Sequence, residues 1–208
     1  MLTTNNLEYS YPNGPTFRFP DLSVDSRDVQ LILGASGKGK TTLLHLLAGL
    51  MNAESGTVEL KGSQLRELKG SARDRFRGNH IGIIFQQAQF IRSITIMQNL
   101  QLARTLAGLK QNLNIAKDLL DELGIGDKAD LYPQSLSIGE RQRASIARAL
   151  ITSPDVVLAD EPTSSLDDRN CQKVADLLQK TVTGHNAALV IVTHDRRLKD
   201  RFPNSVEI

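Results

Sequence analysis

The chain has 208 residues, of which 40% are hydrophobic, and its 25 basic and 23 acidic side chains leave a formal net charge of +2. This length can bury one full core, with room for an inserted subdomain, but not two complete catalytic domains. The charge balance gives no argument for nucleic acid or a membrane surface as partner. Because Cys171 is the only cysteine, an intrachain disulfide and a cysteine-based zinc cluster are excluded, which fits a reducing compartment.

Targeting and membrane-spanning patterns are missing from the sequence. The N-terminal stretch lacks the basic start and the apolar run of a secretory signal. No apolar run approaches the ~20 residues that a membrane-spanning helix needs. We therefore expect a soluble or peripheral protein of the cytoplasm.

The first 30 residues alternate polar and apolar side chains. Two alternating stretches, 7–11 and 16–19, flank the turn Pro12-Asn-Gly14. This pattern is typical of an antiparallel hairpin. We expect residues 1–30 and about 54–68 to form an antiparallel β subdomain.

Short apolar runs recur along the rest of the chain and predict buried strands of a mostly parallel sheet. Helical spacing of leucine and valine follows the first and the third of these runs, which indicates an α/β layout. The four runs span residues 29–33, 81–85, 156–159 and 187–192.

The segment Gly34-Ala-Ser-Gly-Lys-Gly-Lys-Thr41, called the phosphate loop below, matches G-x-x-x-x-G-K-[ST] between an expected strand and an expected helix. Its glycines let the backbone wrap around an anion, and the amides of the helix start point at the phosphates. Lys40 should reach the β- and γ-phosphates, and the Thr41 hydroxyl should bind Mg²⁺. The expected nucleotide-binding set is Gly34, Ala35, Ser36, Gly37, Lys38, Gly39, Lys40, Thr41 and Thr42.

Residues from about 87 to 150 have helical spacing and no strand-like run, so we interpret them as a helical insertion. Near its end lies Leu136-Ser-Ile-Gly-Glu140, called the signature segment below. Ser137, with Glu140 three residues later, has the pattern of a capping box that opens a helix. Ile138 then needs only to point outward, while Gly139 keeps a close backbone approach possible.

Two acidic residues, Asp160 and Glu161, follow the third apolar run and begin the segment Asp160-Glu-Pro-Thr-Ser-Ser-Leu-Asp167. They should emerge at the carboxyl end of a buried strand, where open α/β sheets gather ligand groups. His194 ends the last apolar run in the same way.

The order of phosphate loop, signature segment and residues 156–167 resembles that of the ATP-binding cassette (ABC) ATPases over nearly the whole chain. The common signature is Leu-Ser-Gly-Gly-Gln, so this chain departs from it at Ile138 and Glu140. The resemblance implies one ABC ATPase domain, 1–208, with a P-loop NTPase RecA-like core around a mainly parallel sheet. An N-terminal antiparallel β subdomain and an inserted α-helical subdomain, about 87–150, would complete it.

The resemblance also implies roles for single residues. Asp160 resembles the Walker B aspartate that binds Mg²⁺, and Glu161 resembles the glutamate that polarises the attacking water. His194 resembles the switch histidine that contacts the γ-phosphate. Gln86 resembles the glutamine that senses Mg²⁺ and the water. Tyr11 resembles the aromatic that stacks on adenine, with Tyr9 or an ordinary packing role as open alternatives.

In this family the signature of one subunit completes the nucleotide site of another. The resemblance therefore implies that Ser137, Gly139 and Asp167 serve ATP held by a second ABC ATPase subunit, most simply a second copy in a homodimer. ATP binding would close the dimer and hydrolysis would reopen it. We expect the unusual signature segment to work despite Ile138.

The resemblance further implies a separate transmembrane permease, with the protein peripheral on the cytoplasmic face of the cell membrane. Residues 85–90 and 95–99 look like the groove that accepts the permease. Phe90 and Ile91 are candidates for an apolar contact there, with packing inside the helical insertion an equal alternative. Several features are most similar to the lipoprotein-releasing and macrolide-exporter-type systems.

Other functions stay open at this stage. An ATPase of the same fold could serve cell division through a different membrane partner. A soluble ABC ATPase acting on nucleic acid or ribosomes usually has coiled-coil arms or a second cassette, so no nucleic acid is expected here. Nucleotide binding without catalysis is disfavoured, because Lys40, Asp160, Glu161 and His194 occur together.

Overall fold

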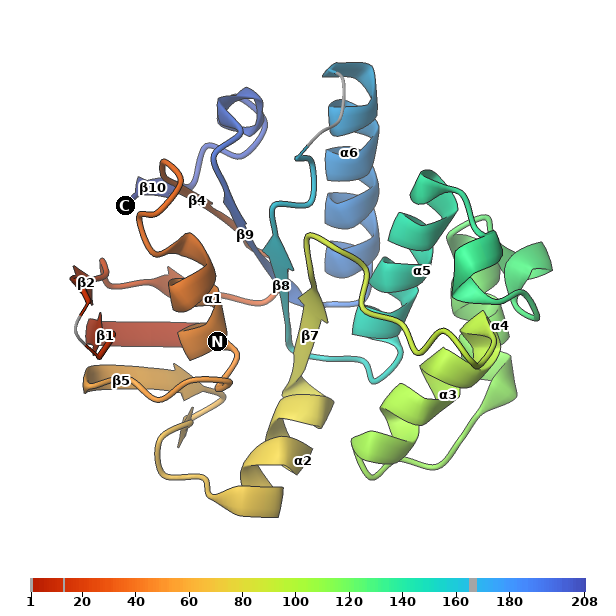
Figure 1. The fold of residues 1–208 in the computed structure, drawn as a ribbon, viewed down its shortest axis with the longest axis horizontal. Helices are drawn as coiled ribbons and strands as arrows, with labels where there is room; N and C mark the ends of the chain where they lie inside the picture. The colour runs from red at the N-terminus through yellow and green to blue at the C-terminus, as the bar shows by residue number, and fades with distance from the viewer. Residues whose placement is uncertain (1, 13, 165–167) are drawn as a thin grey trace.

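The computed structural model of the chain describes residues 2–12, 14–164 and 168–208 (Figure 1). Two sheets form its frame, one antiparallel and one parallel. Helices cover the parallel sheet on both faces, and the chain between the third and fifth helices spreads away from it. The predicted α/β class is confirmed.

The antiparallel sheet contains the predicted N-terminal hairpin. Its strands run in the order β2-β1-β5-β6, and β3 also pairs with β1. Where β1 bulges opposite β5, Gly56 has φ +79°, and a Cβ there would lie 2.2 Å from the carbonyl oxygen of Asn6. Glycine is therefore required at this crossing. The strands are β1 (Leu2–Ser10), β2 (Thr16–Arg18), β3 (Ser23–Val24), β5 (Ser55–Leu60) and β6 (Ser63–Gln64).

The parallel sheet has the order β10-β4-β9-β8-β7. Because its neighbouring strands are parallel, the carboxyl ends of β4, β9 and β8 meet at one edge. The phosphate loop, His194 and the Asp160-Glu161 pair lie there, which is how distant parts of the sequence come together. The strands are β4 (Val29–Leu33), β7 (Ile81–Ile84), β8 (Val156–Asp160), β9 (Ala188–Thr193) and β10 (Ser205–Glu207).

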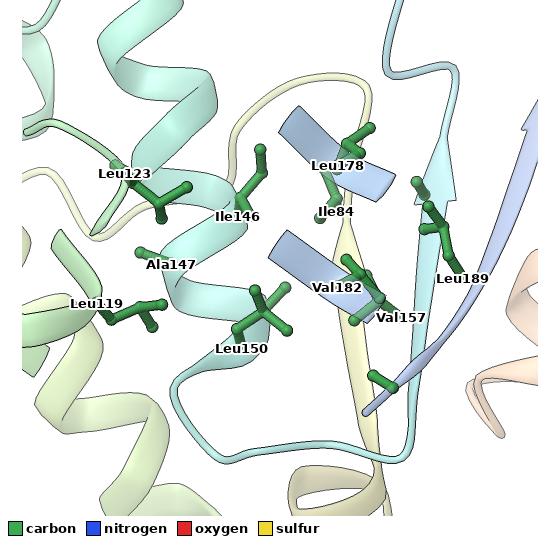
Figure 2. Packing of buried hydrophobic residues seen from close by; sticks show 14 of the residues in the cluster. Ile84, Leu119, Leu123, Ile146, Ala147, Leu150, Val157, Leu178, Val182 and Leu189 are labelled. Carbon is green, nitrogen blue, oxygen red and sulfur yellow. The ribbon is translucent and has the colours of Figure 1, made fainter. Parts of the chain in front are cut away.

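Each central strand is buried on both faces. In β8, Val156 and Leu158 join the cluster beneath α1 (Lys40–Leu47) and the antiparallel sheet. The alternate residues Val157 and Ala159 face the cluster of α5 (Ile138–Leu150) and α6 (Asp168–Gly184). Figure 2 shows this second cluster, with Ile146 and Leu150 of α5 near the strands and Leu178 of α6 beside them. Two-sided burial explains why these strands read as continuous apolar runs.

The region from about 87 to 150 is helical, as predicted. It holds α3 (Ile96–Leu106), α4 (Leu113–Glu122), two single 3-10 turns at 126–128 and 133–135, and α5. Leu119 and Leu123 extend its core toward α5 (Figure 2). Gly124, with φ +67°, follows the end of α4 as a left-handed cap. The division of the chain into subdomains at these boundaries stays a prediction.

A helix, an edge strand and the short 3-10 turn at 196–198 were not predicted from the sequence. The helix α2 (Gly70–His80) has no fully buried residue, so it carries no apolar stripe to indicate it. The edge strand β10 is three residues long and offers Val206 as its single apolar side chain. Within the described ranges, no helix is both long enough and apolar enough to span a bilayer.

Candidate functional site

A cleft of about 530 Å³ opens at the carboxyl edge of the parallel sheet. This volume lies in the range of ordinary small-molecule sites. The cleft is where the three sequence motifs that end β4, β8 and β9 converge. Its lining comprises Phe17, Ala35, Ser36, Gly37, Gly39, Lys40, Thr41, Thr42, Gln86, Glu161 and His194.

The phosphate loop turns sharply at two glycines with left-handed backbone. Gly37 has φ +81° and Gly39 has φ +89°, values that residues with a Cβ adopt rarely. A Cβ on Gly39 would also lie 2.7 Å from the ring of Phe17. Gly39 is the N-cap of α1, and no side chain caps this helix. The first amides of α1 are therefore available to an anion in the cleft.

Lys40 is held ready at the floor of the loop. It is 7% exposed, and its ammonium donates to the carbonyl oxygens of Gly34 at 2.9 Å and Ala35 at 3.0 Å. The same ammonium lies 3.4 Å from Glu161 Oε1. A phosphate entering the loop would meet a positive charge whose stem is already fixed by packing.

Asp160 and Thr41 form an oxygen-rich pair beneath the loop. The Thr41 hydroxyl donates to Asp160 Oδ2 at 3.3 Å. Asp160 Oδ1 is buried and has no hydrogen-bond partner among the described residues. Burial raises the pKa of this carboxyl above its usual value. An unpaired buried carboxylate oxygen beside a hydroxyl is the donor set that a hard divalent cation prefers.

Glu161 is clamped by the end of β9. The Thr193 hydroxyl donates to Glu161 Oε2 at 2.7 Å, and His194 Nδ1 lies 2.9 Å from the same oxygen. Burial alone would raise the pKa of Glu161, but these hydrogen bonds outweigh it and hold the pKa below its usual value. The backbone of Glu161 has φ +47°, an unusual conformation for a residue with a side chain. The carboxylate is thus ionised and held in one orientation, as a general base requires.

Gln86 follows β7 and reaches the cleft from the side of the helical region. Its amide Nε2 donates to Ser164 Oγ at 3.3 Å, and the residue is otherwise exposed. Lys38 lies on the outer side of the phosphate loop and is also exposed. The structure therefore brings Gln86 to the cleft, whereas Lys38 borders a neighbouring hollow with Arg196.

The aromatic residues at the mouth of the cleft sharpen the sequence prediction. Tyr11 is 40% exposed, and its hydroxyl lies 3.0 Å from the Thr42 hydroxyl. Its ring meets those of Tyr9 and Phe17 edge to face, at centroid distances of 4.9 and 6.2 Å. Phe17, and not Tyr11, lines the cleft. Sequence reasoning missed Phe17, although the hairpin register that places it opposite Tyr9 could have indicated it.

The signature segment does not line this cleft. Ser137 is the N-cap of α5 and forms the predicted capping box with Glu140. Its hydroxyl also donates to Glu140 Oε2 at 2.7 Å, so the proton that could serve a phosphate is bonded within the segment. Ile138 is 77% exposed, as expected for an outward side chain. Gly139 has open space around it, and Asp167 lies outside the described residues.

Comparisons with known proteins agree with this geometry. A family model described as ABC transporter matches residues 19–164. The chain is 38% identical over 216 residues to the lipoprotein-releasing system ATP-binding protein LolD of Xanthomonas campestris pv. campestris (strain 8004), covering 100% of this chain and 90% of that protein. It is 37% identical over 215 residues to the macrolide export ATP-binding/permease protein MacB of Escherichia coli O157:H7, covering 100% of this chain and 33% of that protein.

A solved structure supports the same relationship. The dimeric post-hydrolysis state of the ATP-binding cassette MJ0796, bound to ADP and Pi, superimposes with a TM-score of 0.81. The match covers 94% of this chain and 88% of that chain at 29% sequence identity. The fold around the cleft is therefore shared with a cassette whose structure holds the products of ATP hydrolysis.

Proposed function

This chain belongs to the ABC transporter family, and on that premise we propose that it is the ATP-binding and ATP-hydrolysing subunit of a membrane complex. The observation that carries the proposal is that Lys40, Glu161 and His194 line one cleft at the phosphate loop, while Asp160 is hydrogen-bonded to Thr41 of the same lining. A module that merely bound nucleotide would have no need of a clamped, ionised glutamate at this place.

The phosphate loop and the start of α1 bind the triphosphate of ATP. Lys40 exchanges its present carbonyl partners for the β- and γ-phosphates, and Phe17 or Tyr11 supports the base. Mg²⁺ fits the pair Thr41 and Asp160, because the unpaired Asp160 Oδ1 requires a partner there. Gln86 would be a further ligand. When bound, the ion neutralises charge on the phosphates.

Hydrolysis uses the groups that end β8 and β9. Glu161 orients the attacking water and accepts its proton, because its carboxylate is held in place beside the cleft by Thr193 and His194. His194, which is hydrogen-bonded to Glu161, contacts the γ-phosphate. Proton acceptance and phosphate contact are thus assigned to two neighbouring side chains.

A second copy completes the site. Ser137 and Gly139 are exposed at the start of α5 and do not line the cleft of their own chain. We assign them, with Asp167, to the nucleotide bound by a partner cassette in a head-to-tail homodimer. The dimeric state of the MJ0796 cassette supports this arrangement.

A separate permease docks on a groove of about 730 Å³ beside β7 and α3. Its lining combines apolar side chains such as Phe90, Ile91 and Leu106 with Arg148 and with the ion pair of Arg77 and Asp74. Arg148 lies over the Phe90 ring at 5.2 Å, so the groove offers both an apolar floor and positive charge. An amphipathic helix of a membrane protein fits such a surface.

The complex to which the chain belongs is of the lipoprotein-releasing or macrolide-export type, on the cytoplasmic face of the membrane. The similarity to LolD over the full chain supports this choice. MacB is named an ATP-binding/permease protein, and this supports a permease as the partner of the present chain. A role in cell division through another membrane partner is the alternative.

Substitution of Glu161 by glutamine tests the proposal. Glu161→Gln keeps the shape but removes the base, so phosphate release should fall about 100-fold or more, while ATP binding persists. The variant should accumulate as a dimer in ATP and Mg²⁺. Phosphate release and size-exclusion chromatography, with the membrane fraction present and absent, measure both effects.

The matched control is Glu67→Gln, which makes the same change at an exposed residue outside the cleft. It should leave turnover unchanged. Equal phosphate release from wild type and Glu161→Gln would remove Glu161 from the proposed role. Loss of ATP binding in Glu161→Gln would instead indicate that the carboxylate maintains the cleft.

A further inference from the structure

Besides Asp160 and Glu161, the carboxylate of Asp195 is also buried, and it lies behind Glu161 and His194. It is 9% exposed and does not line the cleft, so it cannot touch the nucleotide from its present position. A buried carboxylate costs free energy unless it is well paired. Its partners therefore indicate what it is for.

Arg197 is the first partner of Asp195. The guanidinium donates from Nε to Asp195 Oδ1 at 2.8 Å and from Nη2 to Oδ2 at 2.7 Å, a two-point contact that fixes both groups. The Arg197 amide donates to Oδ1 at 3.1 Å as well. These hydrogen bonds hold the pKa of Asp195 well below its usual value.

Asp195 also contacts two threonines near Glu161, one on each of the two segments that follow β8 and end β9. The Thr163 hydroxyl, two residues after Glu161, donates to Asp195 Oδ2 at 2.9 Å. The Asp195 amide donates to Thr193 Oγ1 at 3.0 Å, and that hydroxyl in turn donates to Glu161 Oε2. Each contact in this series is direct, so a displacement of Asp195 would move the hydroxyl that orients the Glu161 carboxylate.

The same pair reaches the first turn of α6. Cys171 Sγ lies 3.4 Å from Asp195 Oδ2, and Arg197 Nη1 donates to Asp168 Oδ1 at 2.6 Å. Cys171 is fully buried, whereas Asp168 is exposed. The ion pair thus joins the β8 end, the β9 end and the start of α6.

We propose that Asp195 and Arg197 are positioning residues that hold Glu161 and His194 in their reactive orientation and tie them to the start of α6. The inference rests on the proposed hydrolytic function of Glu161. Glu161 has the left-handed backbone conformation φ +47°, which persists where surrounding contacts over-determine it. The hydrogen bonds of Thr163 and Thr193 are contacts that hold Glu161 in this conformation.

The test compares two arginines that tie the same segment to the same helix. Arg197→Gln and Arg197→Lys remove or weaken the two-point contact, and Asp195→Asn removes the carboxylate charge. Arg201→Gln is the matched control, because Arg201 binds Asp176 and Gln179 of α6 and is remote from Asp195. All variants are made in the full chain and compared by kcat, KM for ATP, the dissociation constant of ATP and the thermal midpoint.

In Arg197→Gln, kcat should fall about 10-fold to 100-fold while the ATP dissociation constant changes less than about 2-fold, because misplacement affects the attack and not the phosphate loop. Arg197→Lys should recover part of the loss, and Arg201→Gln should match wild type. A loss of ATP affinity equal to the loss of kcat, or equal effects of the two arginines, would overturn the proposal.

Hydrogen exchange of the amides of residues 191–198 gives a readout that needs no turnover. Exchange there should rise in Arg197→Gln and Asp195→Asn, with residues 156–160 protected as in wild type. Unchanged exchange in folded Arg197→Gln contradicts the proposal. Wild type that binds no ATP and hydrolyses none would contradict the proposed function instead, while the exchange result would still decide whether Arg197 holds this segment.

Discussion

The cleft and the signature segment both hold charged and polar side chains with hydrogen bonds. They differ in how buried these side chains are and in how far apart along the chain their partners lie. In the cleft, Lys40, Asp160 and Glu161 are each less than 10% exposed, and their contacts come from several distant strands. In the signature segment, Ser137 is exposed, Glu140 is partly buried, and the two contact each other three residues apart. The first region is built by the tertiary fold, while the second is built by one turn of helix.

This difference indicates where the chain is complete and where it needs a partner. In the cleft, Lys40 and Glu161 are held by neighbours of the same chain, and buried Asp160 Oδ1 has no partner among the described residues and is open to a cation. The Ser137 hydroxyl is instead occupied by Glu140 and must exchange that bond to reach a phosphate. Dimer closure would supply the exchange, and each nucleotide would then be held by two chains.

The largest effect on ATP binding is expected for one of the two lysines of the phosphate loop and not for the other. Lys40→Ala should weaken ATP binding about 100-fold, because about 3 kcal/mol of charge-assisted hydrogen bonds are lost. Lys38→Ala should weaken it less than about 3-fold, because Lys38 is exposed and its charge is screened by solvent. Fluorescent-nucleotide titration at two salt concentrations checks this. Equal losses would place Lys38 in the binding machinery.

A complementation experiment tests whether the signature segment acts on a neighbouring chain. Ser137→Ala should reduce turnover about 10-fold and destabilise α5 by about 1 kcal/mol, since the N-cap is lost. A mixture of Lys40→Ala and Ser137→Ala chains contains dimers in which one of the two shared sites has both residues intact. Such a mixture should hydrolyse ATP faster than either variant alone.

The matched control mixes Lys40→Ala with a Lys40→Ala, Ser137→Ala double variant, which leaves no intact shared site. No gain is expected there. A first mixture no better than the mean of its components would contradict assembly in trans.

The smallest effect is expected at Ile138. Because its side chain is 77% exposed and the capping box on either side is intact, Ile138→Gly should change turnover less than about 3-fold. Glycine at the first turn should lower the thermal midpoint slightly. ATPase assays of the assembled complex check this. A many-fold rise in activity would show that the natural signature segment impairs the site.

Local sequence patterns were sufficient to predict the elements that have a strong apolar pattern or a capping signal. The apolar runs predicted β4, β7, β8 and β9, because strands buried on both faces consist mostly of apolar residues. The capping box at Ser137 was predicted for a similar reason, since its contacts lie within four residues. The helix α2 was missed because none of its residues is fully buried.

The candidate site divides in the same way. The sequence by itself determined the phosphate loop, the acidic pair and the family, because glycine spacing and residue chemistry are local properties. Only the tertiary structure showed that Phe17 lines the cleft and that Asp195 contacts Thr163 and Thr193 near Glu161. The contact between Thr163 and Asp195 joins residues 32 positions apart along the chain, because the parallel strands β8 and β9 end side by side.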